Sequence, residues 1–303
     1  MLNASPKTSE VSKTSEVCAL NRSLVVGNTG RREFREACAA MRAQRPVIEA
    51  PGIDAACAIL AGGEDVFDVI VVAEDRPGQY SEETIDRLRR LAPLARVVGL
   101  LGSWCEGESR TGRPWPASIR VYWHQWLPRF GRESARLDAG ILGSWSLPVT
   151  AGEDERMLAL ADEPFPKRAG RIAIYSPEFA MQDWLGAACR RAGYSTVEKG
   201  DKSNFCEGPT GSPRRIGLIP FSSPHAGESA AAGIFDAGDG DAEYQTLRQL
   251  AADLRPAPVI ALLGFPRVED RDRAVAAGAA AVLSKPLLLE DLYWQLDRLL
   301  LPK

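Results

Sequence analysis

Apolar runs alternate with amphipathic helical patterns along this chain, and the alternation occurs twice. The clearest runs are FDVIVVAED at 67–75 and PVIALLGF at 258–265, in which most consecutive residues are apolar. Such a run is typical of a strand that is buried on both faces of a parallel sheet. Because helical patterns separate these strands, right-handed crossovers with helices on both sheet faces are expected. The chain is therefore predicted to be an α/β protein with two doubly wound, flavodoxin-like parallel-sheet domains.

The first series of strands and helices departs from the regular pattern at its end. Its strands are predicted at 23–27, 46–51, 67–75 and 95–102, and its helices at 32–44, 52–63 and 81–91. A fifth strand is predicted at 121–126, VYWHQW, which places Tyr122, His124 and Trp126 on one face and Trp123 on the other. No helical pattern is recognised between the fourth and fifth strands, so this domain is predicted to be atypical.

The second series is complete. Its strands are predicted at 171–175, 194–200, 214–221, 258–265 and 280–286, and its helices at 179–193, 241–254, 269–278 and 289–300. The Ser-, Ala-, Gly- and Asp-rich segment 222–242 is interpreted as an irregular insert. A short helix is expected at 152–161, within the segment that joins the two series. The predicted division of the chain is a disordered tail at 1–20, a domain at 21–127, a connector at 128–169 that packs on the first domain, and a domain at 170–303.

Composition excludes several classes of protein. A net charge of -3 over 303 residues argues against a general nucleic-acid binder, which normally carries a basic face. No run approaches the ~18 apolar residues of a membrane span. The six cysteines show no paired spacing, which favours free thiols in a reducing compartment. A cytoplasmic protein without cofactor or metal is therefore expected.

The second series resembles a known family. The stretch from PVIALLGF through the AGA turn and Lys285-Pro286 to the last helix is similar to the receiver domain of two-component response regulators. The resemblance covers 171–303 and extends more faintly to 23–126. It implies a phosphoryl-accepting aspartate ending the third strand and an acidic pair that binds Mg²⁺ after the first. It also implies a hydroxyl residue ending the fourth strand and a lysine ending the fifth, which neutralises phosphoryl charge.

Both copies depart from the receiver pattern. In the second copy only Lys285 matches, as a relic of the family's site. The positions of the acidic pair, the acceptor and the hydroxyl residue are assigned to Ser176, Pro177, Pro220 and Leu263. In the first copy Ala73 stands at the acceptor position, with Asp75 two residues beyond. Since neither alanine nor proline accepts a phosphoryl group, both copies are predicted to be degenerate receivers.

The segment 102–126, GSWCEGESRTGRPWPASIRVYWHQW, contains four of the seven tryptophans. It follows the fourth strand, at the edge where doubly wound sheets bind ligands, and His124 falls near the position of the receiver lysine. It also resembles a motif of uncharacterised bacterial proteins, which implies no activity. The candidate binding residues are Trp104, Cys105, Glu106, Glu108, Arg110, Arg113, Trp115, Arg120, Tyr122, Trp123, His124 and Trp126.

Four interpretations of this segment stay open. Arginines that stack on tryptophans grip anionic ligands and are common in partner surfaces, which favours a binding site. A second interpretation is self-packing, in which the arginines stack on the tryptophans in a loop that replaces the missing helix. A nucleophilic site would pair Cys105 with His124, with Glu106 or Glu108 as the third group. A metal site would use the same four residues but lacks a recognised ligand spacing.

These observations favour a phosphorylation-independent signalling or adaptor protein of the pseudo-receiver type, without enzymatic activity. Its expected partner is a protein, such as another signalling protein, and a homodimer through the fourth and fifth strands is a further hypothesis. Nucleic acid and membrane are not expected partners. The alternative function is a sensor for a nucleotide or another anionic ligand, or an unusual enzyme that uses Cys105 and His124, centred on the segment 102–126.

Overall fold

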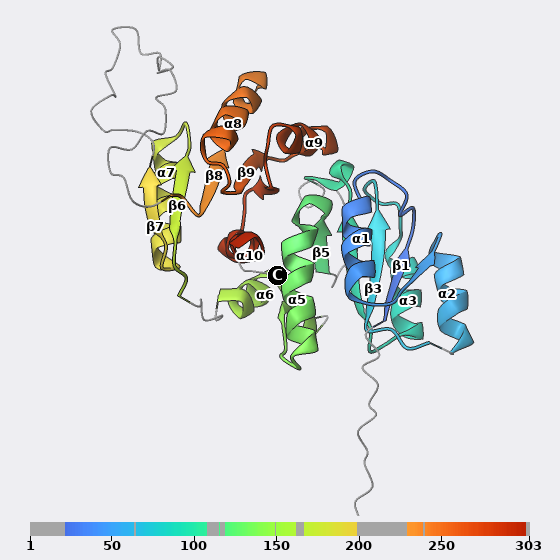
Figure 1. Ribbon diagram of the computed structural model, residues 1–303. Coiled ribbons are helices and arrows are strands. Elements are labelled where there is room, and N and C mark those ends of the chain that lie inside the picture. Colours follow the sequence, from blue (N-terminus) through green and yellow to red (C-terminus); the bar gives the residue numbers. More distant parts are fainter. Residues whose placement is uncertain are drawn as a thin grey trace, which may run out of the picture.

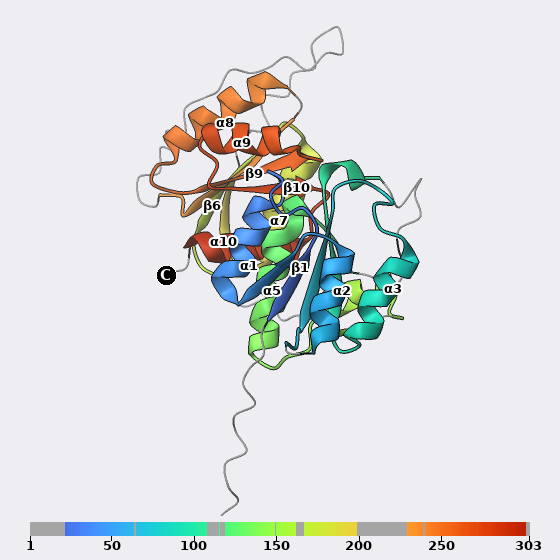
Figure 2. The same ribbon diagram turned by 90° about the vertical axis from the view of Figure 1, so that its right-hand side faces the viewer.

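The chain contains two five-stranded sheets, in each of which all strands run parallel. Figure 1 and Figure 2 show the two sheets with their helices, in blue to green for the first and in yellow-green to red for the second. The computed structural model describes residues 22–63, 65–107, 115, 119–148, 150–161, 167–198, 229–238 and 240–300. The predicted tail at 1–20 lies outside the described residues.

The first sheet has the order β2-β1-β3-β4-β5. Its strands are β1 (Ser23–Val26), β2 (Val47–Ala50), β3 (Val69–Glu74), β4 (Arg96–Leu101) and β5 (Ile119–Tyr122). Its helices are α1 (Arg35–Gln44), α2 (Ile53–Gly62), α3 (Glu82–Leu91) and α5 (Trp126–Asp138). Alternate residues of β3 enter two cores, because successive side chains of a strand point to opposite faces. Val71 packs with α1 and α5, whereas Ile70 packs with α2 and α3.

The second sheet has the order β10-β9-β8-β6-β7. Its strands are β6 (Arg171–Tyr175), β7 (Ser195–Glu198), β8 (Ala232–Asp236), β9 (Val259–Gly264) and β10 (Ala281–Lys285). Its helices are α7 (Phe179–Arg191), α8 (Asp241–Asp253), α9 (Val268–Ala276) and α10 (Leu289–Leu300). Helices α7 and α10 cover one face, and α8 and α9 cover the other. Both sheets therefore follow the flavodoxin-like order 2-1-3-4-5, which confirms the predicted fold class.

Helix α5 corrects the predicted end of the first domain. Strand β5 stops at Tyr122, a 3-10 turn covers Trp123–Gln125, and α5 begins at Trp126. Trp126 and Phe130 lie four residues apart, so they share one helix face, and both are fully buried against the first sheet. Pro128 is tolerated because the first turn of a helix needs no internal N–H donor. The predicted strand at 121–126 is thus wrong beyond Tyr122, and part of the predicted connector is a core helix.

Strand β8 corrects the predicted third strand of the second domain. The position between β6 and β9 is filled by AGIFD at 232–236, within the segment expected to be an irregular insert. The predicted strand at 214–221 and its Pro220 lie outside the described residues. All five residues of β8 are buried, as expected for a central strand. Its last residue is Asp236, so an aspartate does end the third strand.

The joining segment contains two short elements. Helix α6 spans Glu153–Ala161, which confirms the helix predicted at 152–161. The 3-10 turn Ser144–Ser146 inserts Trp145 into the core beneath α5. Cys38, Cys57, Cys105 and Cys189 are free and buried, whereas Cys18 and Cys206 lie outside the described residues. In the part of the chain that the structure describes, no helix is long and apolar enough to cross a membrane.

The two domains pack on each other through α5 and α10, which lie side by side in Figure 1. Asp291 of α10 is buried and accepts a hydrogen bond from Arg132 of α5 at 2.8 Å. Gly131 touches the Trp294 ring so closely that a Cβ atom at this position would clash. The 3-10 turn after β5 also lies against β10. The helices that follow the fifth strands of the two sheets therefore contact each other within the chain, whereas the homodimer contact stays a hypothesis.

Candidate functional site

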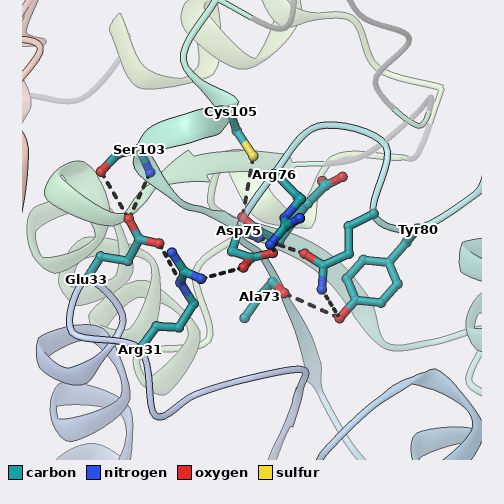
Figure 3. A network of polar contacts seen from close by, with 10 residues as sticks. Arg31, Glu33, Ala73, Asp75, Arg76, Tyr80, Ser103 and Cys105 are labelled. Carbon is teal, nitrogen blue, oxygen red and sulfur yellow. Dashed lines mark hydrogen bonds and ion pairs between the residues drawn. The ribbon is translucent and has the colours of Figure 1, made fainter.

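A polar network ties together three loops at the carboxyl edge of the first sheet (Figure 3). Arg31 follows β1 and donates to Glu33 at 3.1 Å and to Asp75, after β3, at 2.6 Å. Glu33 in turn accepts hydrogen bonds from the backbone N–H and the hydroxyl of Ser103, after β4, at 2.9 and 3.0 Å. Gly102 allows this approach, because a Cβ atom there would lie 2.6 Å from a Glu33 oxygen.

The same network occupies the position of the receiver acceptor in the first domain. The register pairs Val26 with Val72 and, in the second domain, Tyr175 with Phe235, so Ala73 and Asp236 are equivalent. The Tyr80 hydroxyl donates to the Ala73 carbonyl oxygen at 3.5 Å, and burial raises the pKa of Tyr80. The nearby Asp75 is engaged by Arg31. Ala73 at the acceptor position agrees with the sequence prediction.

Cys105 lies beneath this edge in the interior. Its thiol donates to the Glu74 carbonyl oxygen at 3.4 Å, and its own carbonyl accepts from the Tyr122 hydroxyl at 3.4 Å. The Glu74 carboxylate is buried and accepts from the Trp115 indole N–H at 2.9 Å. Arg120 lies 3.7 Å from the same carboxylate oxygen and 5.4 Å from the Trp115 ring centre. These predicted site residues therefore meet one another around the buried Glu74.

His124 interacts with Glu106 and not with the cysteine. Its Nε2 atom lies 2.8 Å from a Glu106 carboxylate oxygen, and its ring stacks on Tyr122. The other ring nitrogen, Nδ1, has no hydrogen-bond partner in the described structure. The nucleophilic hypothesis requires a hydrogen bond between the imidazole and the Cys105 thiol, and the imidazole does not make one. Within the described residues no cluster of His, Cys, Asp and Glu suits a metal ion.

Three tryptophans of the segment are buried and one is exposed. Trp115, Trp123 and Trp126 are buried, and Trp126 stacks on Phe130 with ring centres 5.5 Å apart. Trp104 is 67% exposed. Of the interpretations left open for this segment, self-packing describes these three tryptophans, and Trp104 alone of the four presents its ring to solvent. The remaining candidates, Glu108, Arg110 and Arg113, lie outside the described residues.

The carboxyl edge of the second sheet contains a site that the sequence prediction missed. The Lys285 ammonium donates to one Asp236 oxygen at 2.6 Å, and the Ser176 hydroxyl donates to the other at 2.6 Å. Lys285 also donates to the Ala237 carbonyl oxygen at 3.0 Å. Asp236 is only 2% exposed. Lys285 is therefore part of an ion pair, and the assignment of the acceptor position to Pro220 is wrong.

Two cavities lie between the domains, beside the segment 102–126. One, of about 470 Å³, lies between the network of Figure 3 and the start of α9, and Trp104 and Arg267 contribute to its wall. The other, of about 410 Å³, is lined by Trp123 and His124 on one side and by Arg271 on the other. The two guanidinium groups lie over the two tryptophan rings, 5.9 Å from Trp104 and 5.3 Å from Trp123. Trp104 and Trp123 of the segment thus lie against arginines of the chain's own second domain.

No protein-family model matches the chain, and no curated protein matches it. Among solved structures, it is similar to a "probable two-component system response regulator/GGDEF domain protein" at 15% identity and a TM-score of 0.30, over 92% of this chain and 97% of the other. It is also similar to full-length ShkA in complex with AMPPNP, at 16% identity and a TM-score of 0.29, over 92% of this chain and 50% of that one. The GsuK channel matches at 13% identity and a TM-score of 0.29, over 91% and 63%. Similarities of this size say nothing about what the chain binds.

Proposed function

We propose that this chain is a non-enzymatic signalling adaptor of the pseudo-receiver type, which acts through contacts with a protein partner and without aspartyl phosphorylation. The proposal rests on the hydrogen bonding and burial of the Asp236 carboxylate. A receiver aspartate attacks its phosphodonor with a free carboxylate oxygen, whereas both oxygens of Asp236 are held by Lys285 and Ser176 in a buried position.

The surrounding residues support the same proposal. Ser176 and Pro177 follow β6 where a receiver carries two acids, and neither supplies the carboxylate oxygens that Mg²⁺ prefers. Leu263 stands near the end of β9 where a receiver carries a hydroxyl group. The first domain has Ala73 in place of an acceptor. A domain that has the receiver-like fold but lacks the residues for aspartyl phosphorylation suits a role in binding a partner.

Phosphorylation by a small donor tests the proposal. The protein is incubated with acetyl phosphate and Mg²⁺, and acid-labile phosphate is measured by mass spectrometry of the intact chain. The wild type is expected to remain unmodified, beside an active receiver domain as positive control. Phosphorylation of the wild type that is lost in Asp236→Asn would overturn the proposal.

A gain-of-function variant sharpens the test. Ser176→Asp, Pro177→Asp and Leu263→Thr together restore the acids and the hydroxyl group around Asp236. This triple variant is expected to accept phosphate, as the donor's P–O bond breaks, acetate leaves and an acyl phosphate forms on Asp236. Adding Asp236→Asn should abolish the gain. Circular dichroism checks that the triple variant is folded, and the wild-type result decides the proposal in either case.

A further inference from the structure

The larger cavity between the domains combines an exposed aromatic ring with cationic groups. Trp104 contributes the ring from the loop after β4, and its 67% exposure is unusual for a tryptophan beside a domain interface. Arg267 approaches from the second domain, with its guanidinium 5.9 Å from the ring centre. The volume of about 470 Å³ falls in the range of roughly 300–1,000 Å³ that is typical of small-molecule sites.

The three arginines of this cavity differ in how far they are engaged. Arg31 is held by Glu33 and Asp75 in the network of Figure 3. Arg32 pairs with Asp272 across the interface and lies 3.8 Å from Glu269. Arg267 forms no ion pair in the part of the chain that the structure describes, so its guanidinium is the cation that a ligand would meet first.

The loop that carries Arg267 is held in an uncommon conformation. Phe265, two residues earlier, has φ of 40°, in the left-handed region that bulky residues rarely adopt. Its side chain is 64% exposed, so no burial of the ring explains this conformation. Backbone strain of this kind clusters at binding and catalytic sites, where it fixes the position of a functional group.

We propose that this cavity binds a nucleoside phosphate, with the base stacked on Trp104 and the phosphate bound by Arg267 and, behind it, Arg32. A guanidinium binds phosphate oxygens in pairs, and an exposed indole offers a stacking surface to any base. Inorganic phosphate would leave most of the cavity empty. Because Trp104 and Arg267 belong to different domains, the ligand would bridge them and stabilise their packing.

Binding is measured on the full chain by isothermal titration calorimetry and by tryptophan fluorescence, and the Trp104→Ala variant shows how much of the signal change comes from Trp104 among the seven tryptophans. AMP, ADP, ATP and GMP are the probes, with adenosine and inorganic phosphate as separate arms. At least one nucleotide is expected to bind more tightly than either of its parts. Trp104→Ala and Arg267→Ala should each weaken binding by roughly tenfold or more, the effect of losing one stacking or charged contact.

Two matched variants control for general surface effects. Trp184→Ala removes a partly exposed tryptophan of α7, and Arg248→Ala removes an exposed arginine of α8, both outside the cavity. Neither is expected to change the affinity. The proposal fails if no nucleotide binds, if phosphate or adenosine alone binds as tightly, or if Trp104→Ala and Arg267→Ala bind like the controls. None of these outcomes affects the phosphorylation test of the adaptor function.

Discussion

The carboxyl edges of the two sheets have the same strand order and differ in the side chains at two equivalent positions. The second edge keeps a buried carboxylate, Asp236, together with Lys285. The first edge has Ala73 at the equivalent position, and the register places Trp123 directly after the pair Leu101–Tyr122, where Lys285 follows Leu263–Ser284. Trp123, and not His124 as we expected, thus occupies the place of the lysine. Asp236 and Lys285 thus form an ion pair in the second domain, and both are replaced by uncharged residues at the equivalent positions of the first.

At the first edge, tryptophans contact the second domain. Trp123 takes the lysine position and packs against Arg271 of the second domain. Trp104 meets Arg267, the residue just before α9 and four residues before Arg271. Trp104 and Trp123 of the first edge thus contact the neighbouring domain, whereas the second edge holds the Asp236–Lys285 ion pair.

The largest expected effect concerns the aromatic core of the first domain. Trp126→Ala removes a fully buried ring that stacks on Phe130 and lies 5.8 Å from Trp145. The free energy of unfolding should fall by about 3–5 kcal/mol, as for other large aromatic residues of a core. Urea unfolding followed by circular dichroism measures this loss.

Trp104→Ala is the matched control for that variant. It removes an exposed ring and a cation–π contact, so a loss of about 1 kcal/mol or less is expected. Equal losses for the two variants would contradict the division of the segment into core and surface.

Most of the fold could be predicted from the sequence, because buried parallel strands and capped helices leave local signals. Ser81, for example, was expected to begin a helix, and its hydroxyl accepts the Thr84 N–H. Strand β8 was missed because AGIFD is short and lies among Ala, Gly and Ser. The run RRIGLIPF looks more like a strand by composition alone. Helix α5 was missed because VYWHQW has strong strand propensity, while the helical stripe of Trp126 and Phe130 is only four residues long.

The sites were harder to predict than the fold because they depend on register. Ser176, Asp236 and Lys285 lie at or just after the ends of three strands, and only the pairing of those strands brings Ser176 and Lys285 each within 2.6 Å of Asp236. Likewise, the burial of Trp115 follows from its contact with Glu74, which precedes it by 41 residues. The sequence shows which residue types are present, but tertiary packing determines which of them are exposed and which meet in a site.

An intermediate effect is expected at the second edge. Lys285→Met leaves the buried Asp236 without its cation, which should cost about 2 kcal/mol of stability, less than for a fully buried pair because Lys285 is partly exposed. The double variant Asp236→Ala/Lys285→Met removes both charges of the pair, as Ala73 and Trp123 do at the equivalent positions of the first sheet, and should recover most of the loss. Urea unfolding of the wild type, both single variants and the double variant forms a thermodynamic cycle. Additive losses would show that the two groups do not depend on each other.

The smallest effect concerns a feature that the two domains share, a buried cysteine on the first helix of each. Burial raises the pKa of Cys38 on α1 to about 11 and that of Cys189 on α7 to about 12. In the unfolded chain a thiol titrates near a pKa of about 8.5, so between these values only the unfolded state loses its proton. The stability that each protonated, buried thiol contributes is therefore complete below about pH 8.5 and is lost as the pH rises toward 11 or 12.

As the pH rises from about 7.5 to about 9.5, each thiol should lower the free energy of unfolding by about 1 kcal/mol. Cys38→Ala or Cys189→Ala should remove the part of this pH dependence that comes from the replaced thiol. Rapid alkylation of either cysteine in the folded protein at about pH 8.5 would contradict this burial, because only the thiolate reacts.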